Sequence, residues 1–162
     1  ALGARVIAVA RGPEKLQVCK DRGAAITIDS AEEDVVARVK ALGGVDVVYD
    51  PVGGDPFVAA LKCCKPEARY LVIGFASGDV PQIKANHLLV KNVDVLGFYW
   101  GGYMGFAPQI LLNSLTNVFA MISKGQLNPH IGGSYDFDRA LEALADLKAR
   151  KSIGKLVVRG PV

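Results

Sequence analysis

Three apolar segments of this chain each run directly into a loop that carries glycine. They are VDVVYDPVGG (Val45–Gly54), RYLVIGFASG (Arg69–Gly78) and VDVLGFYWGG (Val93–Gly102). In an open parallel sheet, ligands bind beyond the carboxyl ends of the strands, and glycine lets the backbone approach a ligand closely at that edge. This repeated pattern predicts part of a nucleotide-binding fold.

Strand and helix patterns alternate through the first half of the chain. The expected strands are Arg5–Ala10, Ala25–Ile28, Val45–Tyr49 and Tyr70–Ile73. A helical segment follows each of the first three, and such alternation is typical of a parallel sheet covered by helices on both faces.

The helix boundaries are predicted from capping residues. Pro13 suits a first helical turn, and Gly23 suits the end of the same helix. Ser30 and Glu33 have the spacing of a capping box for a helix through Leu42, and Asp55 is expected to cap a helix that runs to about residue 65. A turn is expected at residues 66–67, before the fourth strand.

The second half of the chain follows a different pattern. It predicts a short helix around residues 86–90, a strand at Val93–Trp100, a long helix over 108–124 and a closing strand at Lys155–Arg159. An amphipathic helix capped by Asp136 is expected from five apolar residues at helical spacing: Phe137, Ala140, Leu141, Leu144 and Leu147.

The chain has neither a G-x-G-x-x-G nor a G-x-x-x-x-G-K-[ST] fingerprint, and its first residues, Ala1–Gly3, look like the end of a helix. We therefore expect an α/β, Rossmann-like doubly wound parallel sheet that lacks its first strand and its glycine-rich phosphate loop. Because the first strand is central in that fold, its absence is expected to leave two strands with an unpaired edge.

Composition excludes several classes of protein. With 162 residues and 51% hydrophobic content, the chain is expected to form one domain. Its 19 basic and 16 acidic residues are dispersed, which argues against nucleic acid as a partner. No apolar run reaches the length of a membrane span, so we expect a soluble, cytoplasmic protein. Three cysteines, two of them adjacent, and two distant histidines predict reduced core thiols and no metal site.

An ordered set of motifs makes the chain similar to a known family. The motifs PEK, VDVVYDPVGG, GFASG, LLVKN, GFYWGGY, LNPHIG and IGKLVV occur in that order along the chain. Together they resemble the cofactor-binding half of the medium-chain dehydrogenase/reductase superfamily, in its zinc-independent quinone oxidoreductase branch. The resemblance covers nearly the whole chain and implies that residues 1–162 form an incomplete dinucleotide-binding domain, in which residues from about 136 onward return towards a catalytic domain.

Basic residues follow the first expected strand, where an NAD-selective domain has an acidic residue. Arg11 and Lys15 suit the 2′-phosphate of NADPH, through bidentate and point-charge contacts respectively. The resemblance also implies that Ser30 lies near that phosphate. The alternative is that both cations are solvated surface residues.

The other expected cofactor contacts follow the later strands. Gly53 and Gly54 would let the backbone approach the adenosine side of the cofactor, or would simply form a tight turn. The resemblance implies that Gly74, Phe75 and Ala76 pass beside the nicotinamide ribose, and that the main chain of Phe98, Tyr99 and Trp100 lies against the carboxamide. The catalytic residues stay unknown, and Tyr103 is the one side chain considered as a proton donor.

The resemblance implies an NADPH-dependent enzyme that transfers hydride to a quinone or to an electron-poor alkene. The alternatives are a non-catalytic nucleotide-binding or structural relative, a zinc-dependent alcohol dehydrogenase and an enoyl reductase. The apolar segment Val93–Trp100 is expected at the edge of the sheet and carries one charge, Asp94. We expect it to pair with its own copy in a homodimer.

Overall fold

The computed structural model describes residues 1–161. The fold consists of two compact units, Ile28–Ser114 and a second unit that combines Ala1–Thr27 with the chain from Leu115 onward. Both units contain helices and parallel strand pairs, so the expected α/β class is confirmed.

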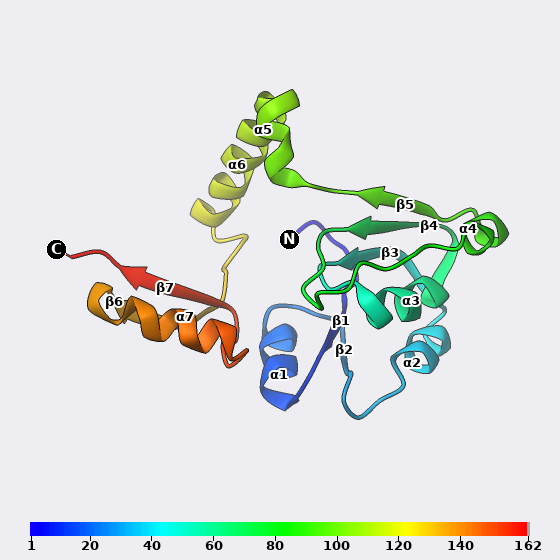
Figure 1. Ribbon diagram of the computed structural model, residues 1–162, viewed down its shortest axis with the longest axis horizontal. Coiled ribbons are helices and arrows are strands. Elements are labelled where there is room, and N and C mark those ends of the chain that lie inside the picture. The colour runs from blue at the N-terminus through cyan, green and yellow to red at the C-terminus, as the bar shows by residue number, and fades with distance from the viewer. Residues whose placement is uncertain (162) are drawn as a thin grey trace. The chain divides into compact units, whose positions relative to one another are not determined.

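The unit Ile28–Ser114 is built on a three-stranded parallel sheet with strand order β3-β4-β5 (Figure 1). Its strands are β3 (Val45–Asp50), β4 (Cys64–Val72) and β5 (Asp94–Gly97). Its helices are α2 (Val35–Ala41), α3 (Gly54–Cys63), α4 (Ala85–Lys91) and the short α5 (Tyr103–Phe106), which follows a 3₁₀ turn at Trp100–Gly102. Asp50 pairs with Val72, and Val72 pairs with Gly97, so the three strands end at a common edge.

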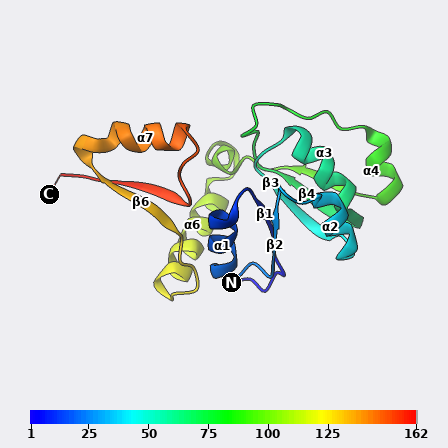
Figure 2. The same ribbon diagram turned by 90° about the horizontal axis from the view of Figure 1, so that it is seen from below.

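Helix α3 covers this sheet, and α2 lies beside α3 (Figure 2). Phe57 and Leu61, one helical turn apart on α3, are both buried. The ring of Phe57 lies 4.4 Å from the ring of Tyr70 on β4, measured between centroids. The buried cluster around them consists of Phe57, Leu61, Cys64, Ala68, Tyr70 and Val93.

Two of the cysteines belong to the core of this unit. The thiols of Cys63 and Cys64 donate hydrogen bonds to the carbonyls of Ala59 and Ala60, at 3.3 and 3.6 Å. Burial raises the pKa of both thiols above the ordinary value. Both are buried, as expected of core thiols, whereas Cys19 is half-buried.

Strand β4 begins earlier than predicted. It starts at Cys64 rather than at Tyr70, and the register with β3 shifts between Val45 and Val47. The expected turn at residues 66–67 is instead an irregularity within the strand, where Glu67 has a φ of 62°. The extra residues of β4 between Cys64 and Arg69 form a bulge, and the pairing with β3 continues after it.

Two helix starts also differ from prediction. The side chain of Asp34, not Ser30, caps α2 by accepting the N–H of Ala37 at 3.0 Å, because Asp34 directly precedes the helix. Glu33 instead accepts the N–H of Asp29 at 3.0 Å. Helix α3 begins at Gly54 with Gly53 as its N-cap, which places Asp55 inside the first turn.

The second unit contains β1 (Ile7–Ala10), which pairs with β2 (Ile26–Asp29), and α1 (Pro13–Asp21) between them. It also contains β6 (Ile131–Asp136), a 3₁₀ turn (Phe137–Arg139), α7 (Ala140–Lys148) and β7 (Lys155–Arg159). The strands β6 and β7 pair in parallel, and α7 packs along them (Figure 2). Strand β2 and helix α6 (Pro108–Ser123) each cross the boundary between the two units.

Glycines permit the close approach at the start of the β6–β7 pair. A Cβ atom on Gly154, which has a φ of 80°, would lie 2.5 Å from the carbonyl oxygen of His130. A Cβ on Gly132 would collide with the carbonyl of Ile153. This contact explains why the LNPHIG and IGKLVV segments both carry glycine.

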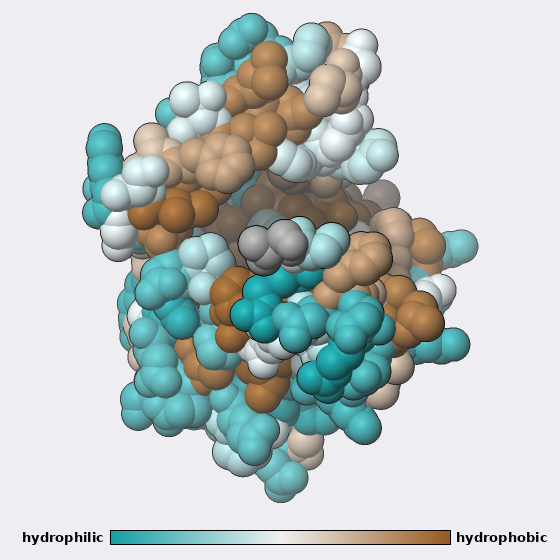
Figure 3. Space-filling model, turned by 90° about the vertical axis from the view of Figure 1, so that its left-hand side faces the viewer, coloured by the Kyte–Doolittle hydropathy of each residue, from teal (hydrophilic) through white to brown (hydrophobic). Residues whose placement is uncertain are grey.

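The predicted amphipathic helix is present but shorter. It starts as α7 at Ala140, and Asp136 does not cap it, because its carboxylate pairs with Arg159 at 2.8 Å. The apolar face of the helix is exposed at Leu141, Leu144 and Leu147. Helix α6 also exposes apolar side chains, and Figure 3 shows hydrophobic surface at the top of the view, where α5 and α6 lie.

The described strands pair in three separate sheets. The β1–β2 pair and the β3-β4-β5 sheet are separate, and β3 pairs with β4 alone among the described residues. Val47 and Tyr49 on β3 are 56% and 67% exposed, so β3 is not covered as a central strand would be.

Candidate functional site at the carboxyl ends of β3, β4 and β5

The loop after β3 is held by its own aspartate. One oxygen of the Asp50 carboxylate accepts the backbone N–H groups of Val52 and Gly53, at 2.8 and 3.1 Å. This turn, in which an Asp side chain binds amides two and three residues on, is a common way for Asp to end a strand. It turns the chain into α3 through Gly53 and Gly54, whose φ angles are 71° and 59°.

The loop after β4 is bound to this first loop along its length. The N–H groups of Ala76 and Ser77 donate to the carbonyls of Pro51 and Val52, at 3.0 and 2.9 Å. The hydroxyl of Ser77 donates a second bond to Val52, at 2.7 Å. The parallel pairing of β3 and β4 therefore continues into the two loops.

The two glycines of the first loop face the second loop. A Cβ atom on Gly53 would lie 2.8 Å from the carbonyl oxygen of Asp79 and 2.9 Å from the ring of Phe75. A Cβ on Gly54 would lie 3.1 Å from the hydroxyl oxygen of Ser77. These glycines are thus required for contact between the loops, a reason that the sequence pattern alone did not reveal.

A buried Tyr–Asp pair holds the first loop in place. The hydroxyl of Tyr70, which is fully buried, donates to the second carboxylate oxygen of Asp50 at 2.9 Å. Asp50 is also buried, with 6% of its surface exposed. Burial, with the hydrogen bond to Asp50, raises the pKa of Tyr70 far above its ordinary value. Sequence reasoning placed Asp50 and Tyr70 in their segments but gave neither residue a role.

The segment after β5 lies at the same edge of the sheet. Phe98 donates its N–H to the carbonyl of Val72, the last residue of β4, at 3.0 Å. The side chain of Tyr99 is 81% exposed, and that of Trp100 is 41% exposed. The ring of Tyr103 lies 6.0 Å from that of Phe98, so Tyr103 is a packing partner of the segment.

Backbone donors at this edge include two without an acceptor in the described part of the chain, at Phe75 and Tyr99. Among residues 1–161, no hydrogen bond uses the N–H of Phe75 or that of Tyr99. A backbone amide without a partner is costly only when it is buried. Phe75 and Tyr99 are exposed, so their amides are available to a ligand.

The predicted phosphate-binding cations lie at the start of the other unit. Arg11 follows β1 and is exposed, and Lys15 lies in the first turn of α1. Within the described part of the chain, neither side chain has a hydrogen-bond or ion-pair partner. Ser30 follows β2 and is exposed. Arg11 and Ser30 thus directly follow the two strands of the β1–β2 pair, and Lys15 lies on the helix that connects them.

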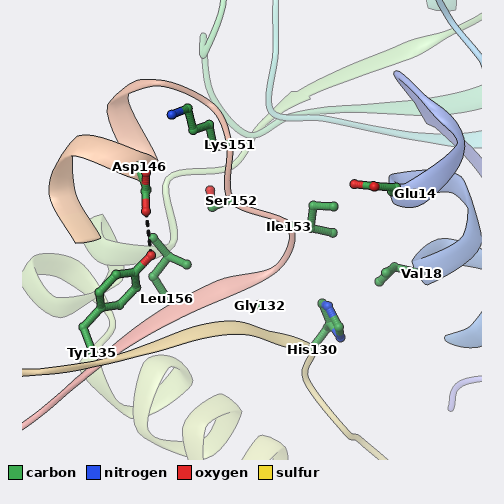
Figure 4. A pocket seen from close by; sticks show the side chains of 10 residues that line it. All are labelled: Glu14, Val18, His130, Gly132, Tyr135, Asp146, Lys151, Ser152, Ile153 and Leu156. Atoms are coloured by element: carbon green, nitrogen blue, oxygen red, sulfur yellow. Dashed lines mark hydrogen bonds between the residues drawn. The ribbon is translucent and has the colours of Figure 1, made fainter. Parts of the chain in front are cut away.

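A cavity of about 370 Å³ lies within the unit that contains α7, and it includes none of the predicted cofactor residues (Figure 4). Its walls come from α1 and from residues 130–156, with Glu14, Val18 and His130 on one side. On the other side, the hydroxyl of Tyr135 donates to the carboxylate of Asp146 at 2.7 Å. The hydrogen bond of Asp146 raises the pKa of Tyr135.

The described residues contain neither a metal-binding cluster nor a membrane-spanning helix. No group of three or more His, Cys, Asp and Glu side chains among residues 1–161 is arranged to hold a metal ion. No helix in the same range is both long enough and apolar enough to span a membrane.

Comparison with known proteins identifies the family. The model of the family described as zinc-binding dehydrogenase matches residues 1–116. The chain belongs to the zinc-binding dehydrogenase family. Within the medium-chain dehydrogenase/reductase superfamily, it corresponds to the cofactor-binding half of the quinone oxidoreductase branch.

Individual members of the family support this placement. A quinone oxidoreductase-like protein 2 homolog from Nematostella vectensis is 40% identical, over 96% of this chain and 44% of the relative. A Pseudomonas syringae quinone oxidoreductase structure matches with a TM-score of 0.85 and 32% identity, over 97% of this chain and 49% of that one. The Escherichia coli quinone oxidoreductase complexed with NADPH gives a TM-score of 0.83 and 27% identity, over 98% and 50% of the two chains. The dehydrogenase chain thus spans about half the length of these relatives.

Proposed function

We propose that the protein containing this chain is an NADPH-dependent oxidoreductase that transfers hydride to a quinone or to an electron-poor alkene. The observation that carries the proposal is the common edge of β3, β4 and β5, where the segments after β4 and β5 present the free N–H groups of Phe75 and Tyr99. Similarity to a solved quinone oxidoreductase with NADPH bound supports the choice of cofactor.

The residues present fit such a cofactor. Unpaired backbone amides suit the carboxamide and hydroxyl oxygens of a nicotinamide nucleotide, which accept hydrogen bonds. The free guanidinium of Arg11 and the free ammonium of Lys15 suit a 2′-phosphate, with Ser30 as a further hydroxyl donor. Gly53 and Gly54 allow the close contact between the two loops, and Gly74 and Ala76 add no bulky side chain of their own at this edge.

When bound, NADPH supplies a hydride, and the acceptor takes up that hydride together with a proton. The residues of this chain bind and orient the nicotinamide, because an aligned hydride donor and acceptor react as an intramolecular pair. The exposed rings of Phe75, Tyr99 and Trp100 are apolar surfaces that exclude water from the reacting face. Such a reaction requires no side-chain base from this chain.

Binding and turnover measurements test the proposal separately. The protein is titrated with NADPH and with NADH by nucleotide fluorescence, and NADPH consumption is then followed with benzoquinone and with a simple enone. We expect binding of NADPH and turnover with one or both acceptors. Tight binding without turnover would favour a non-catalytic relative, and turnover abolished by a chelator would favour a zinc-dependent alcohol dehydrogenase or enoyl reductase.

We further propose that the protein is a homodimer formed through the segment Val93–Trp100. The support is that β5 is the last strand of the sheet, and that Leu96 and Phe98 are 43% and 39% exposed. Strand β5 spans only Asp94–Gly97, which is shorter than the predicted segment Val93–Trp100. A 3₁₀ turn begins at Trp100. An exposed edge with apolar side chains is normally covered by pairing.

A further inference from the structure

We infer that Asp50 and Tyr70 are positioning residues, which set the shape of the loop edge on which the nicotinamide nucleotide is to bind. This inference rests on the proposed function, because it assigns a role at the same site. Neither side chain is at the surface: Asp50 is 6% exposed and Tyr70 is fully buried. They act on a ligand only through the backbone that they hold.

The Asp50 carboxylate is fully used by three donors. One oxygen accepts the amides of Val52 and Gly53, and the other accepts the hydroxyl of Tyr70 at 2.9 Å. A buried carboxylate is tolerated only when donors of this kind surround it. The Tyr70 hydroxyl therefore fixes the rotation of the carboxylate, and the carboxylate fixes the two amides of the loop.

The constraint passes from the first loop to the second. The carbonyls of Pro51 and Val52 accept the amides of Ala76 and Ser77, at 3.0 and 2.9 Å. Gly54 in turn donates its N–H to the carbonyl of Asp79, at 3.1 Å. Gly74 also donates its N–H to the carbonyl of Asp50, at 3.4 Å, so Phe75 lies between the anchored residues Gly74 and Ala76, and its own N–H is free.

The pair can be separated from the packing of the core. The ring of Tyr70 packs against Phe57 at 4.4 Å, and this contact needs no hydroxyl. Tyr70→Phe keeps the ring and removes the hydroxyl, which donates to Asp50 at 2.9 Å and, over a longer distance of 3.4 Å, to the carbonyl of Phe57. The variant therefore leaves one oxygen of a buried carboxylate without its donor, and a small shift of the loop is expected to relieve that loss.

The experiment compares Tyr70→Phe with Tyr135→Phe in the protein that contains this chain. Tyr135→Phe removes another Tyr–Asp hydrogen bond, of 2.7 Å to Asp146, in the other unit. Asp50→Ala, which removes all three bonds, serves as a stronger second variant. Each protein is assayed for NADPH binding, for kcat at saturating NADPH, and for amide hydrogen exchange of the peptide containing residues 50–57.

For Tyr70→Phe we expect faster exchange at Val52 and Gly53, a rise of about tenfold in the Kd for NADPH, and a kcat within about twofold of wild type. Tyr135→Phe should change none of these. Normal exchange, or faster exchange with an unchanged Kd, would overturn the positioning role. If Asp50→Ala does not fold, Tyr70→Phe alone decides the result.

The two proposals fail in different ways. If the wild-type protein does not bind NADPH, the proposed function is wrong, and the positioning role is wrong with it. If the wild type binds NADPH and Tyr70→Phe binds equally well, the inference about Asp50 and Tyr70 alone is wrong.

Discussion

The carbonyl oxygen of Asp79 lies 2.8 Å from the position that a Cβ atom on Gly53 would occupy. Gly53 also has a φ of 71°, in the left-handed region that favours glycine. A side chain at this position would therefore meet two obstacles, one in its own backbone conformation and one in the neighbouring loop.

Gly53→Ala is expected to lower the free energy of unfolding by about 2–4 kcal/mol, because left-handed strain and overpacking add. Gly78→Ala is the matched control, since Gly78 has a φ of 86° but no atom within 4 Å of its Cβ position. The control should lose only about 1–2 kcal/mol. Urea unfolding of the two variants measures the difference, and equal losses would show that the contact with Asp79 has no energetic weight.

The sequence predicted the layout of this edge better than its internal contacts. Alternating strand and helix signals located β3, β4 and β5 because parallel strands have strong apolar runs. The same reasoning assigned Gly53 and Gly54 to cofactor contact or to a tight turn, and it did not predict their contact with residues 75–79. Contact between two loops that are distant in sequence leaves no periodic signal.

The helix caps show a second reason for failure. Ser30 and Glu33 match the capping-box spacing, but Asp34 lies closer to the apolar run and caps α2 instead. Several polar residues in one loop offer competing caps, and local spacing does not choose among them. The roles of Asp50 and Tyr70 depend on strand pairing, which brings together residues 20 positions apart. An Asp that ends a strand before glycine was the available signal for Asp50.

The cysteines give a prediction about pH and reactivity. Burial raises the pKa of Cys63 and Cys64, so at a given pH each has less thiolate than an exposed cysteine. In a titration with a disulfide reagent near pH 8, the half-buried Cys19 should react first, and the other two should react only as the protein unfolds. Rapid modification of all three thiols in the folded protein would contradict this, and Cys19→Ser identifies the fast phase.

Cofactor preference is expected to depend on Arg11. Arg11→Glu replaces a free cation after β1 with a carboxylate, which should repel a 2′-phosphate and leave a cofactor without that group much less affected. Loss of one charge-assisted contact costs about 1.5–3 kcal/mol, which raises the Kd for NADPH by about tenfold or more. Arg5→Glu makes the same change in net charge at another exposed position. Parallel titrations with NADPH and NADH measure the effect, and equal weakening of both would refute the role of Arg11.

The last prediction concerns the edge strand β5. Leu96 is 43% exposed and pairs with Leu71 of β4. The other edge of β5 pairs with no strand among the described residues. A lysine at this position adds a charge that opposes pairing between two copies of the strand. Leu96→Lys is therefore expected to convert dimers into monomers in light scattering, whereas Leu89→Lys, at a 78% exposed position on α4, should leave the mass unchanged. The same change should weaken NADPH binding, because β5 leads directly to Phe98 and Tyr99 at the candidate site. A Leu96→Lys protein that stays dimeric would place the interface elsewhere, and a monomer that retains full NADPH affinity would separate assembly from the cofactor site.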